Sequence, residues 1–371
     1  MRPRVLIAAP FPPPTTGQSL VTEMAADALA DVADVVRLDT ADRTRVWRRP
    51  WAIPSRRAAR WAATLSRVRD VLRSESIDAV YLTPASSALG LLRDVLMVGT
   101  IPRGTPIVAH VHVGDYGRLL GNPVLGPIAR ALARRFSVVI TPSAYAAARI
   151  RAVFPEADLR VVLNTVRPAL RFTPAEVEGA WEDRRAGKPV VLFLSNMIPS
   201  KGYERLAEAV PHLQHDVEIV FAGAWSGDDE REAFEARLGE LGVDARVCGG
   251  VGRYETKDLF RSASVFAFPS TYPHESLPLA VLEAKAAGCA VVAFDHAGLR
   301  EMVRDGVDGR LIPPGTPRDL ARALDDAVAK AEVYGHAGAL EVREAFAPEA
   351  FCTSLAGIVI GLSSRRSSVP A

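Results

Sequence analysis

Cysteine and histidine are scarce in this sequence of 371 residues, which contains 3 cysteines and 7 histidines. The cysteines are far apart and have no paired spacing, which argues against a zinc site or a disulfide framework and favours a reducing compartment. There is no run of about 18 apolar residues, so we expect no membrane-spanning helix. The apolar run Val5–Ala9 is too short for a signal peptide and predicts a buried strand. We therefore expect a cytoplasmic protein.

Lysine is absent from the first half of the chain, although arginine is abundant there. Residues 1–170 contain 23 arginines against 13 acidic residues, a net charge of +10. The remainder has 22 basic and 30 acidic residues, a net charge of −8. The overall composition, 49% hydrophobic and 24% charged, is typical of a globular protein. We expect the first half to meet an anionic partner.

Short apolar runs alternate with amphipathic segments along the whole chain, which is typical of parallel sheets covered by helices on both faces. Two such series predict an α/β protein with two doubly wound Rossmann-like domains. We expect domains at 1–170 and 171–349, a polar seam at Pro168–Pro189, and a C-terminal helix or tail at 350–371 that returns to the first domain. The predicted strands are Val5–Ala9, Val35–Leu38, Ala79–Leu82, Ile107–His112, Val138–Thr141, Val161–Leu163, Val190–Leu194, Glu218–Ala222, Arg246–Cys248, Val265–Phe268, Ala290–Phe294 and Arg310–Ile312.

The most informative segment is residues 269–288, which follows a predicted strand. A helix is expected to begin near Pro278, where proline loses no hydrogen bond, and to end at Gly288. Glu275 precedes this helix and Glu283 lies inside it. The amides and dipole at a helix N-terminus suit a diphosphate, and a nearby carboxylate accepts hydrogen bonds from vicinal hydroxyls such as those of a ribose. Spacing alone also allows Glu283 to be a solvated surface residue.

This segment resembles the Glu-x7-Glu signature of retaining family 4 glycosyltransferases, which have the GT-B fold of two Rossmann-like domains facing each other across a cleft. The resemblance extends over His274–Pro314. Further similar segments are Val190–Val210, Val265–Ser270 and, more weakly, Val161–Val166, Val108–His112 and Pro12–Gln18. The resemblance implies that residues 1–170 bind the acceptor and that residues 171–349 bind a nucleotide-sugar donor.

The resemblance also implies roles for single residues of the second half. Glu283 would hold the donor ribose, and Glu275 would contact the transferred sugar near the reacting centre. Lys201 would neutralise the diphosphate leaving group. The backbone amides that would help to bind the sugar and phosphates belong to Ser276, Leu277 and Leu279.

Two residues of the first half complete the implied site. Period-two alternation puts His110 and His112 on the same face of a strand, and the resemblance places His112 against the donor sugar. A structural histidine is the alternative interpretation. Gly17, in the loop after the first strand, would allow close approach of the backbone to a phosphate, although a plain turn glycine also fits.

The sequence departs from the family pattern at Asn196, where family members usually carry arginine. The second phosphate-binding cation is therefore missing from its usual place. Either another cation replaces it, with Arg118 and Arg253 as candidates, or the affinity for the donor is lower.

The sequence contains no Asp-x-Asp motif and no set of histidine and aspartate residues with ligand spacing. We therefore expect no metal and no other cofactor, with the nucleotide-diphosphate sugar acting as co-substrate. The implied mechanism is front-face transfer with retention, in which the departing diphosphate oxygen accepts the proton of the acceptor hydroxyl. A covalent intermediate on Glu275 is the second alternative. The acceptor class stays open among glycans, lipid-linked molecules and small natural products.

The segment Arg43–Arg73 holds ten arginines and one acidic residue, Asp70. One interpretation is a packing helix with a solvated basic face. The other is contact with an anionic membrane at the inner face, which would favour a membrane-proximal acceptor. A nucleic-acid partner is not expected, because no recognised module is present. The apolar stripe of the predicted helix is Trp61, Leu65, Val68 and Leu72.

Other functions remain as alternatives to glycosyl transfer. A nucleotide-sugar epimerase or a phosphorylase would share the GT-B fold. A non-catalytic sugar-nucleotide-binding protein is favoured only by Asn196. A nicotinamide dehydrogenase is disfavoured, because no Gly-x-Gly-x-x-Gly follows any predicted strand.

Overall fold

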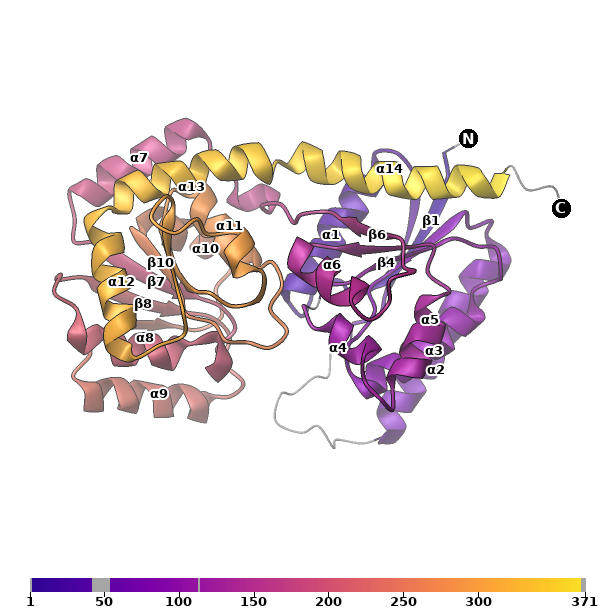
Figure 1. The fold of residues 1–371 in the computed structure, drawn as a ribbon, viewed down its shortest axis with the longest axis horizontal. Coiled ribbons are helices and arrows are strands. Elements are labelled where there is room, and N and C mark those ends of the chain that lie inside the picture. Colours follow the sequence, from indigo (N-terminus) through magenta and orange to yellow (C-terminus); the bar gives the residue numbers. More distant parts are fainter. Residues whose placement is uncertain (1, 42–53, 113, 368–371) are drawn as a thin grey trace. The chain divides into compact units, whose positions relative to one another are not determined.

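The computed structural model describes residues 2–41, 54–112 and 114–367. Contacts divide the chain into two compact units. Unit 1 comprises Met1–Asn164 and Pro348–Ala371, and unit 2 comprises Thr165–Ala347. Each unit contains one parallel six-stranded sheet flanked by helices (Figure 1). The predicted pair of doubly wound α/β sheets is therefore confirmed.

The sheet of unit 1 has the strand order β2-β1-β3-β4-β5-β6. The order reverses between β1 and β3, so the loops that follow these two strands lie at a topological switch point. The strands are β1 Arg4–Ala9, β2 Asp34–Asp39, β3 Ala79–Leu82, β4 Ile107–His110, β5 Val138–Thr141 and β6 Leu159–Val161. The helices are α1 Gly17–Ala30, α2 Pro54–Ser74, α3 Ala88–Thr100, α4 Tyr116–Leu120, α5 Gly126–Ala133, α6 Ala144–Arg151 and α14 Pro348–Ser367.

The sheet of unit 2 has the order β12-β11-β10-β7-β8-β9, so its switch point lies between β7 and β10. The strands are β7 Val190–Leu194, β8 Glu218–Ala222, β9 Arg246–Cys248, β10 Val265–Phe268, β11 Ala290–Phe294 and β12 Gly309–Ile312. The helices are α7 Pro174–Arg185, α8 Tyr203–Ala209, α9 Asp228–Leu241, α10 Arg253–Ser262, α11 Leu279–Ala286, α12 Pro317–Ala329 and α13 Ala331–Ala345, with short 3-10 turns that include η1 Pro168–Leu170.

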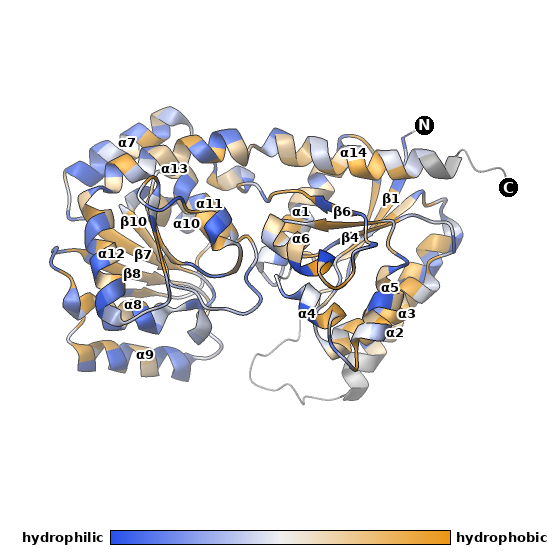
Figure 2. Cartoon of the chain, viewed as in Figure 1, coloured by the Kyte–Doolittle hydropathy of each residue, from blue (hydrophilic) through white to orange (hydrophobic). Residues whose placement is uncertain are grey.

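Every predicted strand is present. The central strands are marked by hydrophobicity alone, because they are buried on both faces of a parallel sheet. These strands are orange in Figure 2. The largest difference is at β6, which pairs with β5 two residues earlier than expected. β6 is an edge strand that contains the exposed Arg160, so an apolar run does not mark it. β4 ends at His110, which leaves His112 in the following loop.

The predicted polar seam at Pro168–Pro189 is wrong in one respect, because most of it is the helix α7. Its inner face buries Val177, Trp181 and Arg184 in unit 2. The charge of this face weakened the helical pattern in the sequence. Residues 165–170, which we assigned to the first domain, belong to unit 2, where η1 packs against α10.

The expectation that no stretch is apolar enough to span a membrane is corrected at the C-terminus. Ala331–Ser364 meets the requirement by length and composition, with 22% of its apolar window buried. This stretch comprises α13 and most of α14. α13 packs against α11 and β11 in unit 2, whereas α14 packs against α1 and β3 in unit 1. The stretch therefore resembles a membrane-spanning helix in its length and composition only.

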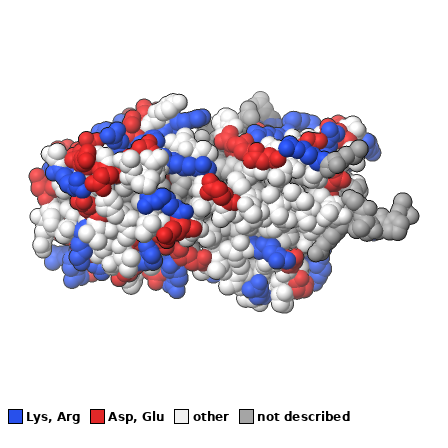
Figure 3. All heavy atoms as spheres, turned by 90° about the horizontal axis from the view of Figure 1, so that it is seen from above, with Lys and Arg blue, Asp and Glu red and all other residues white. Residues whose placement is uncertain are grey.

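The stripe predicted on α2 is a packing surface. Val68 is fully buried in the core of unit 1, and Leu65 and Leu72 pack against that core. The part of the arginine-rich segment at residues 43–53 lies outside the described residues. On the face shown in Figure 3, basic and acidic side chains are interspersed among uncharged ones, so neither positive nor negative charge dominates there.

Candidate functional site

Lys201 and Glu275 meet at the switch point of the sheet in unit 2. Lys201 lies in the loop after β7, and Glu275 lies in the loop after the neighbouring strand β10. The Lys201 Nζ atom is 2.6 Å from Glu275 Oε2, and the side chains are 13% and 6% exposed. Ligands of open α/β sheets bind at such switch points. The structure thus joins two predicted site residues that are 74 positions apart.

Two residues that the sequence analysis missed hold this pair. Ser270 Oγ donates a hydrogen bond to Glu275 Oε2 at 3.0 Å. The Lys201 ammonium lies 4.5 Å from the centroid of the Tyr272 ring, within the range of a cation–π interaction. Both belong to the polar run after β10, and their position beyond the end of a central strand is the signal that could have identified them.

Gly202 allows the two loops to approach each other. Its φ is +94°, in the left-handed region, and a Cβ atom there would lie 2.2 Å from the carbonyl oxygen of Pro269. Next to this contact, the Thr271 amide donates to the carbonyl of Ser200 at 2.8 Å. The glycine that follows Lys201 therefore has a structural reason, because it lets Lys201 reach the loop of Glu275.

Glu283 lies inside α11, which begins at Leu279 as the sequence predicts to within one residue. Gly288 follows the helix with a φ of +72° and ends it, as expected. Glu283 is 1% exposed, so the alternative interpretation as a solvated residue is wrong. Burial raises the pKa of its carboxyl, and the adjacent Arg167 partly opposes this shift.

Arg167 is a third residue that the sequence analysis missed. Its Nε donates to Glu283 Oε1, and its Nη2 donates to Oε2 at 2.8 Å. The pair is bidentate, and the two residues are 116 positions apart. Arg167 directly follows the segment Val161–Val166 of the family resemblance, but no local pattern connects it with Glu283.

The remaining predicted donor-binding residues of unit 2 are Asn196, Arg253 and three residues whose backbone amides were implied. Asn196 is half-buried in the loop after β7, where its backbone carbonyl accepts a hydrogen bond from the Ile198 amide at 2.8 Å. Arg253 is the first residue of α10, is exposed, and forms no ion pair with another described residue. It is thus available to an anion. The three residues whose amides were implied in donor binding are buried: Ser276 and Leu277 in the segment before α11, and Leu279 as its first residue.

In unit 1, the rings of His110 and His112 lie on the same side, with centroids 4.0 Å apart, as alternation predicts. His110 is fully buried, and its Nδ1 is 2.6 Å from the hydroxyl of Tyr81, which makes it a structural residue. His112 is half-buried, and its Nε2 has no hydrogen-bond partner among the described residues. Burial lowers the pKa of His112 to about 3, so its ring is neutral at pH 7.

Gly17 is the first residue of α1, directly after the loop at the switch point of unit 1. It is exposed, and a Cβ atom there would meet no other atom within 4 Å. Its role in backbone approach therefore stays a prediction. Arg118, in α4, is also exposed.

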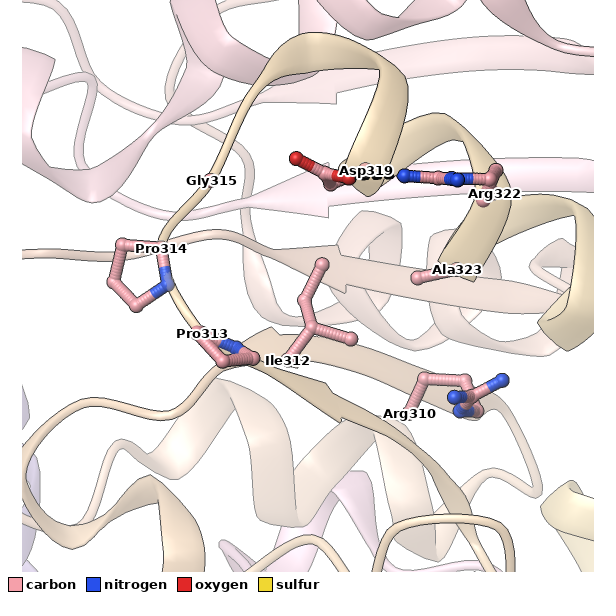
Figure 4. Close-up of a pocket in the computed structure, with 8 residues that line it drawn as sticks. All are labelled: Arg310, Ile312, Pro313, Pro314, Gly315, Asp319, Arg322 and Ala323. Carbon is pink, nitrogen blue, oxygen red and sulfur yellow. Dashed lines mark hydrogen bonds and ion pairs between the residues drawn. The ribbon is translucent and has the colours of Figure 1, made fainter.

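A pocket in unit 2 contains none of the predicted site residues (Figure 4). It lies at the end of the edge strand β12 and is lined by Arg310, Ile312, Pro313, Pro314, Gly315, Asp319, Arg322 and Ala323. Arg310 forms ion pairs with Asp305 and Asp326, and Arg322 pairs with Asp319. The guanidinium groups of the pocket are therefore already neutralised. Across the described part of the chain, no group of three histidine, cysteine or acidic residues could hold a metal ion.

Two family models match the chain. The model described as Glycosyltransferase Family 4 matches residues 5–170, and that described as Glycosyl transferases group 1 matches residues 180–339. Over 292 residues the chain is 30% identical to a GDP-mannose-dependent alpha-(1-6)-phosphatidylinositol monomannoside mannosyltransferase of Mycolicibacterium smegmatis, with 74% of each chain covered.

Other curated relatives match over shorter regions. An uncharacterized glycosyltransferase of Methanocaldococcus jannaschii is 29% identical over 50% of each chain. A phosphatidyl-myo-inositol mannosyltransferase of Mycobacterium tuberculosis is 34% identical over 38% of this chain and 37% of its own. The chain thus spans half or less of the length of these two relatives.

Solved structures share the fold over nearly the whole chain. HepE of Anabaena in complex with UDP and glucose has a TM-score of 0.71 at 18% identity, covering 98% of this chain and 99% of its own. The sucrose-phosphate synthase of Thermosynechococcus elongatus has a TM-score of 0.75 at 18% identity, covering 98% and 100%. These similarities identify the GT-B fold.

Proposed function

This chain belongs to the family 4 glycosyltransferases of group 1, and from this premise we propose that it transfers a hexose from a nucleotide-diphosphate sugar to an acceptor hydroxyl with retention of configuration. The observation that carries the proposal is the buried Lys201–Glu275 pair at the switch point of unit 2. A cation and a carboxylate held together in a largely desolvated place are suited to a charged leaving group beside a polar sugar.

In the proposed mechanism, Lys201 stabilises the charge that develops on the diphosphate. Its ammonium has three N–H donors, and one is directed to Glu275, so two are left for phosphate oxygens. The bond between the anomeric carbon and the diphosphate oxygen breaks, and the acceptor oxygen bonds to the same face of that carbon. The acceptor proton passes to the departing oxygen, so no protein base is needed. A product of inverted configuration would contradict this path.

Glu275 would orient the sugar. Glu275 accepts hydrogen bonds from Lys201 and Ser270 on Oε2, which leaves Oε1 for sugar hydroxyls. The neutral ring of His112 would bind a hydroxyl without acting as a general acid at pH 7. Arg253 and Asn196 would supply the remaining polar contacts to the donor.

Donor binding tests this function most directly. We expect one of a panel of UDP-, GDP-, ADP- and dTDP-sugars to raise the melting temperature of the wild type, since a ligand at about 100 times its Kd adds about 2.7 kcal/mol of stability. Glu283→Ala should lose this shift, because the buried carboxylate is the proposed ribose acceptor. Glu240→Ala, a change of the same type on the exposed end of α9, should keep it. Equal shifts in both variants, or none in the wild type, would contradict the proposal.

We further propose that the enzyme works at an anionic membrane surface, where a lipid-linked acceptor would be presented. α2, α3 and α5 are neighbours in unit 1, and α3 and α5 carry orange segments in Figure 2. Leu89, Leu92 and Leu96 on α3 are 54%, 50% and 45% exposed. Val124, before α5, and Ile128 are 76% and 50% exposed. An apolar helix face of this kind is typical of an interaction site.

Exposed arginines near this apolar face support a membrane surface as its binding partner. Arg67, Arg69 and Arg73 on the neighbouring α2, and Arg103 just after α3, are exposed and form no ion pair with another described residue. Arginine beside apolar side chains is attracted to anionic headgroups while the apolar groups enter the interface. Two of the relatives are named as acting on phosphatidylinositol lipids, which agrees with such an acceptor.

Vesicle flotation tests this surface. Replacing Arg67, Arg69 and Arg73 together with glutamate should weaken binding to phosphatidylglycerol-containing vesicles at least 100-fold, since each arginine contributes about 1 kcal/mol. Leu92→Glu with Leu96→Glu should weaken it as well, while nucleotide-sugar binding is unchanged. Retained vesicle binding in both variants would overturn the proposal. Conversion of a wild-type dimer into a monomer would assign the face to a second copy instead.

A further inference from the structure

Arg167 binds the carboxylate of Glu283, which we propose as the acceptor for the donor ribose. The two nitrogens of its guanidinium edge, Nε and Nη2, each donate to a different oxygen of Glu283. The Arg167 side chain is 20% exposed and that of Glu283 is 1% exposed, so water competes little with the pair. A bidentate contact of this kind fixes the orientation of the carboxylate as well as its charge.

The chain on both sides of Arg167 is anchored within unit 2. Thr165 Oγ1 donates to the carbonyl of Phe346 at 2.7 Å. On the other side, η1 packs against α10, and Leu170 is fully buried. These two anchors lie within three residues of Arg167, so the guanidinium is held at Glu283 before any donor binds.

The other charged groups near α11 are engaged elsewhere. Lys285, on α11 itself, pairs with Asp308 and with Glu341 of α13. Arg184 of α7 donates to backbone carbonyls, and the neighbouring strands β10 and β11 contain no charged residue. Arg167 is thus the charged group that acts on the Glu283 carboxylate within unit 2.

The number of hydrogen-bond acceptor sites on the Glu283 carboxylate shows how the Arg167–Glu283 pair could bind the donor. An ionised carboxylate has about four lone-pair sites on its two oxygens. The guanidinium of Arg167 takes two of them, which leaves two, one for each hydroxyl of a vicinal diol. We infer that Arg167 is a positioning residue that keeps Glu283 ionised and oriented, so that its two remaining acceptor sites bind the 2′- and 3′-hydroxyls of the donor ribose. This inference rests on the proposed function.

Removal of Arg167 should make donor binding dependent on pH. Burial already raises the pKa of Glu283, and loss of the guanidinium removes the group that opposes this shift. The carboxyl would then take up a proton as the pH falls through its raised pKa. A protonated carboxyl has lost an acceptor site and the charge that strengthens its hydrogen bonds, so the diol would bind less tightly at low pH and recover at high pH.

The test is the Kd of a nucleoside diphosphate, chosen as the tightest of UDP, GDP and ADP, measured by calorimetry between about pH 6 and about pH 8.5. We expect a weaker pH dependence from Glu283 in the wild type, where Arg167 opposes protonation, than in Arg167→Met. Arg167→Met should bind about 10- to 100-fold more weakly at the acidic end, and this difference should shrink as the pH rises. Arg167→Lys keeps the positive charge and should restore most of the wild-type profile. The 2′-deoxynucleotide should show a smaller effect of Arg167→Met, because one of the two bonds is missing.

Two further variants separate positioning from folding. Arg167→Gln removes the charge but keeps a hydrogen-bond donor, and it should show the same pH dependence as Arg167→Met. In the Glu283→Gln background, Arg167→Met should add no pH dependence, since nothing is left to titrate. If the wild type binds the nucleotide and both Arg167→Met and Arg167→Gln follow its pH profile, only the role of Arg167 is overturned. If the wild type binds no nucleoside diphosphate, the proposed function is overturned as well.

Discussion

Replacing Lys201 with methionine is expected to lower kcat/KM by about 100- to 1,000-fold, the usual effect of removing one preorganised donor to a developing negative charge. The Lys201 side chain is 13% exposed and its ammonium pairs with Glu275, so it acts in a place where water screens charge poorly. Methionine has a similar length and keeps the contact with the Tyr272 ring while removing the charge. Initial rates measured over a range of donor concentrations would give the loss, which should fall mainly on kcat.

Lys188→Met is the matched control for this prediction. Lys188 lies in the same unit, but its side chain is 46% exposed and pairs with Asp216, which is 90% exposed. Such a surface pair is screened by water, so we expect no change in rate. Equal rates for Lys201→Met and the wild type would contradict the role of Lys201 in the leaving-group step. A loss confined to KM would assign Lys201 to ground-state binding of the donor instead.

Replacing Arg184 with methionine should have the largest effect on stability, a loss of about 3–5 kcal/mol in the free energy of unfolding of unit 2. Arg184 is 7% exposed, in the interior of unit 2. It donates to the carbonyls of Phe260 and Arg261 in α10 and of Ala287 and Gly288 after α11, at 2.9 to 3.0 Å. Without it, the carbonyls at the ends of two helices lose a buried, charged hydrogen-bond donor.

Urea denaturation followed by tryptophan fluorescence would measure this loss, because Trp181 lies on the same helix and donates to Gly288. Arg185→Met is the control, since Arg185 is the next residue of α7 but pairs with Glu178 and Glu332 at the surface. We expect this exposed pair to contribute far less. A similar shift of the urea midpoint in the two variants would show that the buried hydrogen bonds of Arg184 contribute no more to stability than the surface ion pairs of Arg185.

The Arg184 side chain also explains why α7 escaped the sequence analysis. An amphipathic helix is recognised by apolar residues at a period of 3.6, but the inner face of α7 includes a buried arginine beside Val177 and Trp181. The capping box of Thr173 and Glu176, with Pro174 at the first turn, was the local signal that could have identified this helix.

The sequence by itself determined the strands and the location of the two glutamates. Strands such as β7 and β10 are buried on both faces, so their hydrophobic runs mark them without reference to any neighbour. The start of α11 at Leu279 and its end before Gly288 were also local properties, decided by a proline and a glycine. The spacing of Glu275 and Glu283 then followed from the chain alone.

Only the tertiary structure decided which partners these glutamates have. Lys201 reaches Glu275 because β7 and β10 are neighbours across a reversal of strand order, and Arg167 reaches Glu283 because its segment is anchored beside α11. No periodic pattern in the sequence could reveal either contact, since the partners are 74 and 116 residues apart. Hydrophobic patterns record which face of an element is buried, but an ion pair between distant segments depends on the order in which the elements pack.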